Sequence, residues 1–286
     1  MKLVDVFGFL MILLAIYLAV NASASGDVSD PFDGGDQAEE SKPDPDPDPD
    51  PDPDDKPVEG GKVTDDEPDG NEGKITTSDF CANVPETSRF NDLGNKHDEA
   101  IRCMEAAGVV SGETSDTYAP SDALTRAEAA STVAAMIRSS NNLEREGVNL
   151  RSLPEAPQAR FVDVAPDSPH ADAIARLNEA GIIEGYVDAR YEPEGRVSRA
   201  QMASIIDRAY KYMTGAALPG GSDQFTDDDE SVHEDSINAV AEAGIIGGTG
   251  GLEFDPNRSV RRGPMASYMA RTMIRLEETE RITPLN

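Results

Sequence analysis

The sequence predicts an all-α fold built from three helix-loop-helix repeats. One set of residue types recurs three times, with the same spacing from a histidine to an arginine in every copy. In the second copy, Ala173, Ile174, Leu177 and Ala180 recur at helical spacing and mark a buried stripe. Two of the arginines follow a hydroxyl residue and precede Glu or Gln, which is a helix-capping pattern. Because one helix pair cannot bury its own apolar face, we expect three pairs to form a six-helix module.

Each copy runs from a Phe-x-Asp motif through a histidine, two glycines and an aromatic-x-Pro segment to an arginine. In chain order the shared residues are Phe90/Asp92, Phe161/Asp163 and Phe225/Asp227; His97, His170 and His233; Gly108, Gly181 and Gly244; Gly112, Gly185 and Gly248; Pro120, Pro193 and Pro256; and Arg126, Arg199 and Arg262. The first glycine stands where a helix ends in a left-handed residue.

The spacing predicts one short and one longer helix in every copy. The expected ranges are about Asp98–Ala107, Arg126–Arg138, Ala171–Ala180, Arg199–Tyr212, Glu234–Ala243 and Arg262–Leu276. Thr125 and Ser198 open capping boxes, with Glu128 and Gln201 as their partners. The third copy has Pro264 at the corresponding place, which a first helical turn tolerates, although the box is lost.

Residues 1–24 carry the features of a secretory signal peptide. Lys2 precedes an apolar run, and Ala22 and Ala24 supply the small residues that a signal peptidase reads. The alternative is an uncleaved membrane anchor, although the run is shorter than a bilayer span requires. Either interpretation places the remaining chain outside the cytoplasm.

Residues 25–79 are expected to form a disordered acidic linker, followed by repeats at 80–145, 154–215 and 222–280. Pro43–Asp54 alternates strictly between proline and aspartate, which favours an extended spacer. The alternative is a weak Ca²⁺-binding tract, because aspartates are hard oxygen ligands.

The charge and the residue inventory exclude several functions. The formal net charge is -30, which argues against nucleic acid and against an anionic membrane surface as partners. No nucleophile motif or paired catalytic carboxylates stand out, so we predict that the chain is not an enzyme and needs no cofactor. The three histidines could in principle converge on a metal, but local packing at helix starts is the favoured interpretation, and no metal site is predicted. Cys81 and Cys103 are expected to pair as a disulfide in an exported protein.

These motifs resemble the S-layer homology family, in a style closest to its actinobacterial members. The middle elements read AGVVSG, AGIIEG and AGIIGG, and the last elements read LTRAEAA, VSRAQMA and VRRGPMA. The resemblance covers about Phe90 to Glu277. Trp is absent, whereas many members carry an aromatic residue at or beside the histidine position.

The resemblance implies a pseudo-threefold six-helix prism whose grooves bind a secondary cell-wall polymer. We therefore expect a secreted, cell-wall-associated, non-catalytic anchor whose partner is a cell-wall polysaccharide or another anionic envelope glycan. The alternative is a structural surface-layer or membrane-to-wall tether protein that acts by self-assembly or protein contacts.

Arg126, Arg199 and Arg262 are the main candidates for holding an acidic group of the polymer. A cation at a helix start is mildly unfavourable against the helix dipole, but beside free N–H groups it builds an anion-binding corner. The alternative is an ion pair with the Phe-x-Asp aspartate or another acid of the next repeat. We expect the arginine side chains to be largely exposed. The further expected contacts are Gly112, Gly185, Gly248, Asp92, Asp163 and Asp227. For the glycines a structural role is the favoured interpretation, and a backbone that lines a sugar-binding groove is the alternative.

Overall fold

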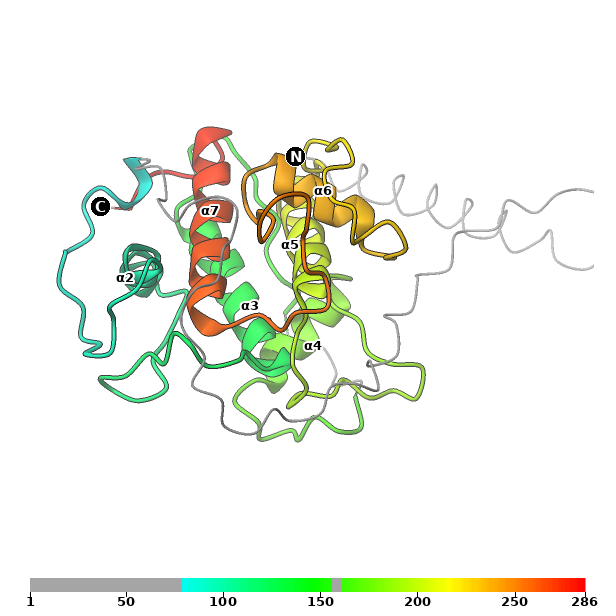
Figure 1. The fold of residues 1–286 in the computed structure, drawn as a ribbon. Helices are drawn as coiled ribbons and strands as arrows, with labels where there is room; N and C mark the ends of the chain where they lie inside the picture. Colours follow the sequence, from blue (N-terminus) through cyan, green and yellow to red (C-terminus); the bar gives the residue numbers. More distant parts are fainter. Residues whose placement is uncertain (1–78, 156–160, 286) are drawn as a thin grey trace, which may run out of the picture. The chain divides into compact units, whose positions relative to one another are not determined.

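The computed structural model describes residues 79–155 and 161–285, and the regular elements within these ranges are all helical. The short helix η1 (Asp79–Cys81) is followed by α2 (Asp98–Ala106), α3 (Arg126–Asn142), α4 (Ala171–Glu179), α5 (Arg199–Thr214), α6 (Glu234–Glu242) and α7 (Arg262–Glu278) (Figure 1). The predicted all-α fold is confirmed, and each of the six predicted helices begins at the predicted residue. The expected signal segment and almost all of the expected linker lie outside the described residues. None of the described helices is long and apolar enough to cross a membrane.

The long helices begin as the sequence predicts. In α3 and α5, the N-cap hydroxyl accepts a hydrogen bond from the backbone of the third helical residue, whose side chain returns the bond to the N-cap N–H. In α7 the N-cap is Arg261, which makes no side-chain cap. The short helices end in left-handed glycines, as expected, with φ of 69° at Gly108 and Gly181 and 71° at Gly244.

Each short helix packs on the long helix of a neighbouring repeat. Helix α4 contacts α3, α6 contacts α5, and α2 contacts α7, which closes the circuit between the third and first repeats. In Figure 1, α2 lies beside α7 and α6 lies beside α5. Because α3 also contacts α5 and α7, the repeats share one apolar core.

A ring of backbone hydrogen bonds joins the segments that lead into the three long helices. The N–H of Leu124 donates to the carbonyl of Val260 (2.8 Å), that of Val260 to Val197 (2.9 Å), and that of Val197 to Leu124 (3.4 Å). All three side chains are buried. The ring relates the three repeats by an approximate threefold axis and places the starts of the three long helices at equivalent positions.

The structure contains a disulfide between Cys81 and Cys103, whose Cα atoms are 5.7 Å apart. It joins η1 to the buried side of α2, because Cys103 is fully buried in that helix. The start of the described chain is thereby fixed to the first repeat.

Candidate functional site in the grooves between repeats

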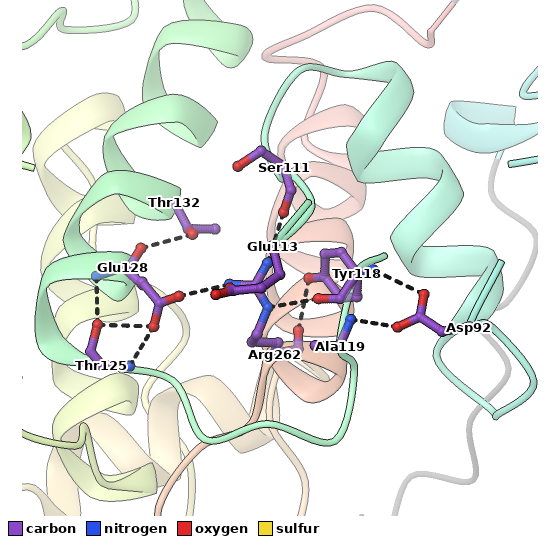
Figure 2. A network of polar contacts seen from close by, with 9 residues as sticks. All are labelled: Asp92, Ser111, Glu113, Tyr118, Ala119, Thr125, Glu128, Thr132 and Arg262. Atoms are coloured by element: carbon purple, nitrogen blue, oxygen red, sulfur yellow. Dashed lines mark hydrogen bonds and ion pairs between the residues drawn. The ribbon is translucent and has the colours of Figure 1, made fainter. Parts of the chain in front are cut away.

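Arg262 leaves the start of α7 and enters the loop of the first repeat. Its Nε donates to the carbonyl of Tyr118 (2.8 Å), and its Nη2 donates to the carbonyl of Ser111 (2.8 Å). Its Nη1 donates to Oε1 of Glu128 on α3 (2.8 Å), as Figure 2 shows. The guanidinium carbon lies 4.9 Å from the centre of the Tyr118 ring. The side chain therefore clamps the third repeat to the first.

The other two arginines make the same clamp one repeat further on. Arg126 donates from Nε to the carbonyl of Tyr191 (2.8 Å) and from Nη2 to the carbonyl of Glu184 (3.2 Å). Arg199 donates from Nε to the carbonyl of Phe254 (2.9 Å) and from Nη2 to the carbonyl of Gly247 (2.7 Å). The three clamps together connect every repeat to the next in a closed cycle.

The expected exposure of these arginines is wrong. Only 5% of Arg126, 2% of Arg199 and 8% of Arg262 is exposed. Their charges are compensated by carbonyl dipoles, aromatic faces and, for Arg262, the carboxylate of Glu128. The alternative of an ion pair with an acid of the neighbouring repeat therefore describes Arg262. The clamps have a structural role in addition to any contact with a ligand.

The Phe-x-Asp aspartates hold their own repeat's loop. Asp92 accepts hydrogen bonds from the N–H groups of Tyr118 (2.9 Å) and Ala119 (2.7 Å), and Ala119 has a positive φ of 60°. Burial acts to raise the pKa of Asp92, but these N–H groups and Arg262 outweigh it, and the pKa lies below its ordinary value. Asp163 and Asp227 make the same two bonds in their repeats. These carboxylates stabilise the strained turn that presents the arginine-accepting carbonyl.

The second glycines have no room for a side chain. A Cβ atom at Gly112 would lie 2.4 Å from the carbonyl oxygen of Thr114 and 2.5 Å from the ring of Phe90. Gly185 and Gly248 are similarly crowded by Phe161 and Phe225. The phenylalanine ring of each Phe-x-Asp motif thus packs against the second glycine of its own repeat. Packing explains why a phenylalanine and a glycine stand at these two positions.

The three histidines contact three different helices. Nδ1 of His97 lies 2.8 Å from the hydroxyl of Ser267, and Nδ1 of His170 lies 2.7 Å from that of Ser131. His233 pairs with Ser204 in the same way at 2.8 Å. Each bond joins the start of a short helix to the neighbouring long helix, so the histidines act locally between repeats.

A cavity of about 560 Å³ lies beside the Arg262 clamp. We call it the Arg262 groove. Its walls come from all three repeats: the first loop, α3, the start of α4 and the start of α7. The polar residues that line it are Ser111, Glu113, Tyr118, Glu128, Ser131, Thr132, His170 and Arg262. Its volume falls in the range of small-ligand sites.

Larger side chains stand at the corresponding places of the other two clamps. Ala135 and Thr132 of α3 line the Arg262 groove, whereas Arg208 and Ile205 stand one repeat further on, where the cavity beside Arg126 measures about 10 Å³. At the Arg199 clamp the equivalent residues are Arg271 and Tyr268, which are 9% and 1% exposed. The hydroxyl of Tyr268 accepts a bond from Nη1 of Arg199 (2.7 Å).

Sequence reasoning identified the arginines but missed the residues that decide whether a groove is open. The signal was present at two aligned positions six and nine residues after each arginine, which read Thr132 and Ala135, Ile205 and Arg208, and Tyr268 and Arg271. The size of these side chains differs sharply among the repeats. Only the packing in the structure shows that these side chains face the loop of the neighbouring repeat.

The S-layer homology domain family matches the chain at residues 89–130, 160–203 and 224–266. The chain contains three tandem S-layer homology domains. The resemblance inferred from the motifs is confirmed, and each matched range holds one Phe-x-Asp motif, one short helix and one arginine clamp. These domains make the chain a secreted, cell-surface protein with an anchoring or surface-layer role.

Similar proteins include both surface-layer proteins and a glycan-degrading enzyme. The chain is 31% identical over 185 residues to the exoglucanase XynX of Acetivibrio thermocellus, and 25% identical over 204 residues to a surface-layer 125 kDa protein of Lysinibacillus sphaericus. It is 29% identical over 187 residues to the S-layer protein EA1 of Bacillus anthracis. These alignments cover 63%, 70% and 64% of this chain, but 16%, 16% and 20% of the relatives. The chain therefore spans a small share of the length of the relatives it matches.

Proposed function

We propose that the three domains anchor this chain to an anionic cell-wall polysaccharide, which binds in the Arg262 groove. The observation that carries the proposal is the contrast in volume between this groove, at about 560 Å³, and its counterpart beside Arg126, at about 10 Å³. Hydroxyl, carboxylate and imidazole groups line the groove, and these are the groups that hydrogen-bond sugar hydroxyls.

The outer edge of Arg262 supplies the contact to the acidic group of the polymer. Nη1 of Arg262 is bonded to Glu128, and Oε2 of Glu113 lies 3.9 Å from the same nitrogen. Glu113 has a side chain that is 59% exposed, so an incoming carboxylate or phosphate displaces it at little cost. A ligand acid in that place gains a charge-assisted bond, while Glu128 keeps the clamp intact.

The same geometry argues against attraction over long distances. The chain is strongly acidic, and the groove itself contains Glu113 and Glu128. Affinity for an anionic polymer therefore depends on short-range contacts, and it should rise when the displaceable acid is removed. Glu113→Gln is expected to strengthen binding about 1.4- to 5-fold, because an exposed charge pair contributes about 0.2–1 kcal/mol.

Retention of the full-length chain on purified cell-wall sacculi tests the proposal. The informative variant is Ala135→Arg, which adds a large side chain to the groove. Arginine is the residue at both related positions, Arg208 and Arg271, and Arg271 donates to the carbonyl of Ile245 (3.2 Å). The matched control is Ala217→Arg, which adds the same side chain at an exposed position outside the groove. Ala135→Arg should weaken retention about tenfold or more, and the control should leave it unchanged.

Chemical removal of the attached polymer separates this function from protein-mediated attachment. Loss of retention on stripped sacculi is expected. Full retention on stripped sacculi, or wild-type retention of Ala135→Arg, would contradict binding in the groove. Concentration-dependent association in solution without wall material would favour the alternative of self-assembly.

A further inference from the structure

The loop between α5 and α6 holds an acidic cluster that the anchoring function does not use. Asp223, Asp228 and Asp229 each place a carboxylate oxygen within 4.8 Å of the others. Among the residues that the structure describes, no other group of three His, Cys, Asp or Glu residues is so arranged. Two oxygens that bind one Ca²⁺ at about 2.3–2.6 Å lie at most about 5 Å apart, so one ion can reach all three.

Asp228 supplies an independent observation that points to a ligand. The residue is 1% exposed, and within the described residues neither of its buried carboxylate oxygens has a hydrogen-bond partner. Burying a carboxylate without partners is strongly unfavourable, and buried charges in proteins are paired or coordinate metals. The buried oxygens of Asp228 therefore lack the partner that their position demands.

The comparison with the other repeats shows that this carboxylate is a departure from the pattern. The residue after the Phe-x-Asp aspartate is Leu93 in the first repeat and Val164 in the second, and both pack against the core. The third repeat has Asp228 at this position and Asp229 beside it. Packing alone calls for an apolar side chain, so the acid at this place needs another explanation.

The neighbouring aspartate is already occupied and does not belong to the cluster. Asp227 accepts bonds from the N–H groups of Phe254 and Asp255, both at 2.7 Å. The three residues of the cluster, in contrast, combine one buried carboxylate with two exposed ones. An ion held between them keeps access to water, which fills the remaining positions of its coordination shell.

We propose that Asp223, Asp228 and Asp229 form a Ca²⁺ site in the third repeat. Three carboxylates are hard oxygen ligands, and Ca²⁺ accepts six to eight oxygens in flexible geometry, whereas Mg²⁺ demands a near-ideal octahedron. Sites of this openness in extracellular modules bind Ca²⁺ with dissociation constants of about 0.1–1 mM. The site lies beside Asp227, which holds the turn that accepts the Arg199 clamp, so bound Ca²⁺ stabilises the third repeat.

Thermal unfolding of the full-length chain, first with a chelator and then with 10 mM CaCl₂ (about ten to a hundred times the expected dissociation constant), tests the site. The wild-type midpoint should rise by about 5 °C with Ca²⁺. Asp228→Asn should lose this rise, and in chelator it should unfold no earlier than the wild type, because the buried charge is gone. Asp228→Val, which copies the second repeat, should behave likewise, and Asp223→Asn should reduce the rise.

Glu230→Gln is the matched control, since it removes an exposed acid from the same loop outside the cluster. It should keep most of the rise. The acidic Pro-Asp tract is present in every variant, so a contribution from that tract would be the same in all of them. Wild-type protein without a rise, or Asp228→Asn with the full rise, would overturn the site. Loss of the rise in Glu230→Gln would overturn it in favour of general charge screening, and an equal rise with 10 mM MgCl₂ would overturn the assignment to Ca²⁺.

Discussion

The Arg262 groove and the Arg199 clamp have the same backbone framework but differ in what fills it. Each has an arginine at the start of a long helix, two loop carbonyls that accept its hydrogen bonds and an aromatic ring beneath it. At Arg262 the neighbouring long helix contributes Thr132 and Ala135, and a cavity of about 560 Å³ remains. At Arg199 it contributes Tyr268 and Arg271, which are buried.

The difference separates the residues that hold the repeats together from the residues that determine whether a ligand can bind. The clamp is present three times because it closes the cycle of repeats, whether or not a ligand can enter. Access of a ligand to the clamp depends on the size of two side chains that lie one helical turn apart on the long helix. A family motif can therefore occur three times in one chain while the cavity beside one copy, Arg262, is far larger than the cavity beside another, Arg126.

The largest expected effect comes from removing a clamp. Arg199→Ala should lower the free energy of unfolding by about 3–5 kcal/mol, because two buried carbonyls and the Tyr268 hydroxyl lose a charged donor. Arg262→Ala should cost a similar amount despite its open groove. Urea unfolding measures both, with exposed Arg138→Ala as a control that should change stability by less than about 0.5 kcal/mol. Equal midpoints for Arg199→Ala and the control would show that the clamps are dispensable.

A smaller loss is expected at the glycines that both regions share. Gly112→Ala and Gly248→Ala should each destabilise by about 1–3 kcal/mol, since the new Cβ would overlap a carbonyl oxygen and the ring of Phe90 or Phe225. Gly94→Ala is the control, because a Cβ there meets nothing within 4 Å. A tolerated Gly112→Ala that weakens polymer binding would instead assign this glycine to ligand contact.

The smallest effect is expected for the hydroxyl of Tyr268. Tyr268→Phe removes the hydroxyl that accepts from Arg199 and keeps the ring, so it should cost about 1–2 kcal/mol and leave polymer binding unchanged. Tyr212→Phe, which removes a solvent-exposed bond to the carbonyl of Ser152, should cost less. If Tyr268→Phe altered polymer binding at all, the Arg199 region would belong to the binding surface.

The helices were predictable because their signals are local. Thr125 with Glu128 and Ser198 with Gln201 identify the starts of two long helices. The repeat spacing predicts the start of the third, where Arg261 makes no cap. Helix ends differ from prediction by one to four residues, most in α3, which continues to Asn142. Its last turns carry no stop signal of the kind that Gly215 provides for α5.

The burial of the arginines could not be predicted because it depends on contacts between repeats. Arg262 and Tyr118 are 144 residues apart, and no spacing rule brings them together. The same holds for Glu128, which the sequence presents as a capping residue and the fold also uses as the partner of Arg262. Asp228 was recognisable as an acid at an apolar repeat position, but its burial required the structure.

The number of polymer fragments bound per chain distinguishes one binding groove from three. Isothermal titration calorimetry with a soluble, size-fractionated fragment of the released wall polymer measures it on the full-length chain. We expect one fragment per chain, binding about tenfold or more weaker in Ala135→Arg, and unchanged stoichiometry in Ala217→Arg. Two or three fragments per chain, or wild-type binding by Ala135→Arg, would contradict the claim that the Arg262 groove is the site of attachment.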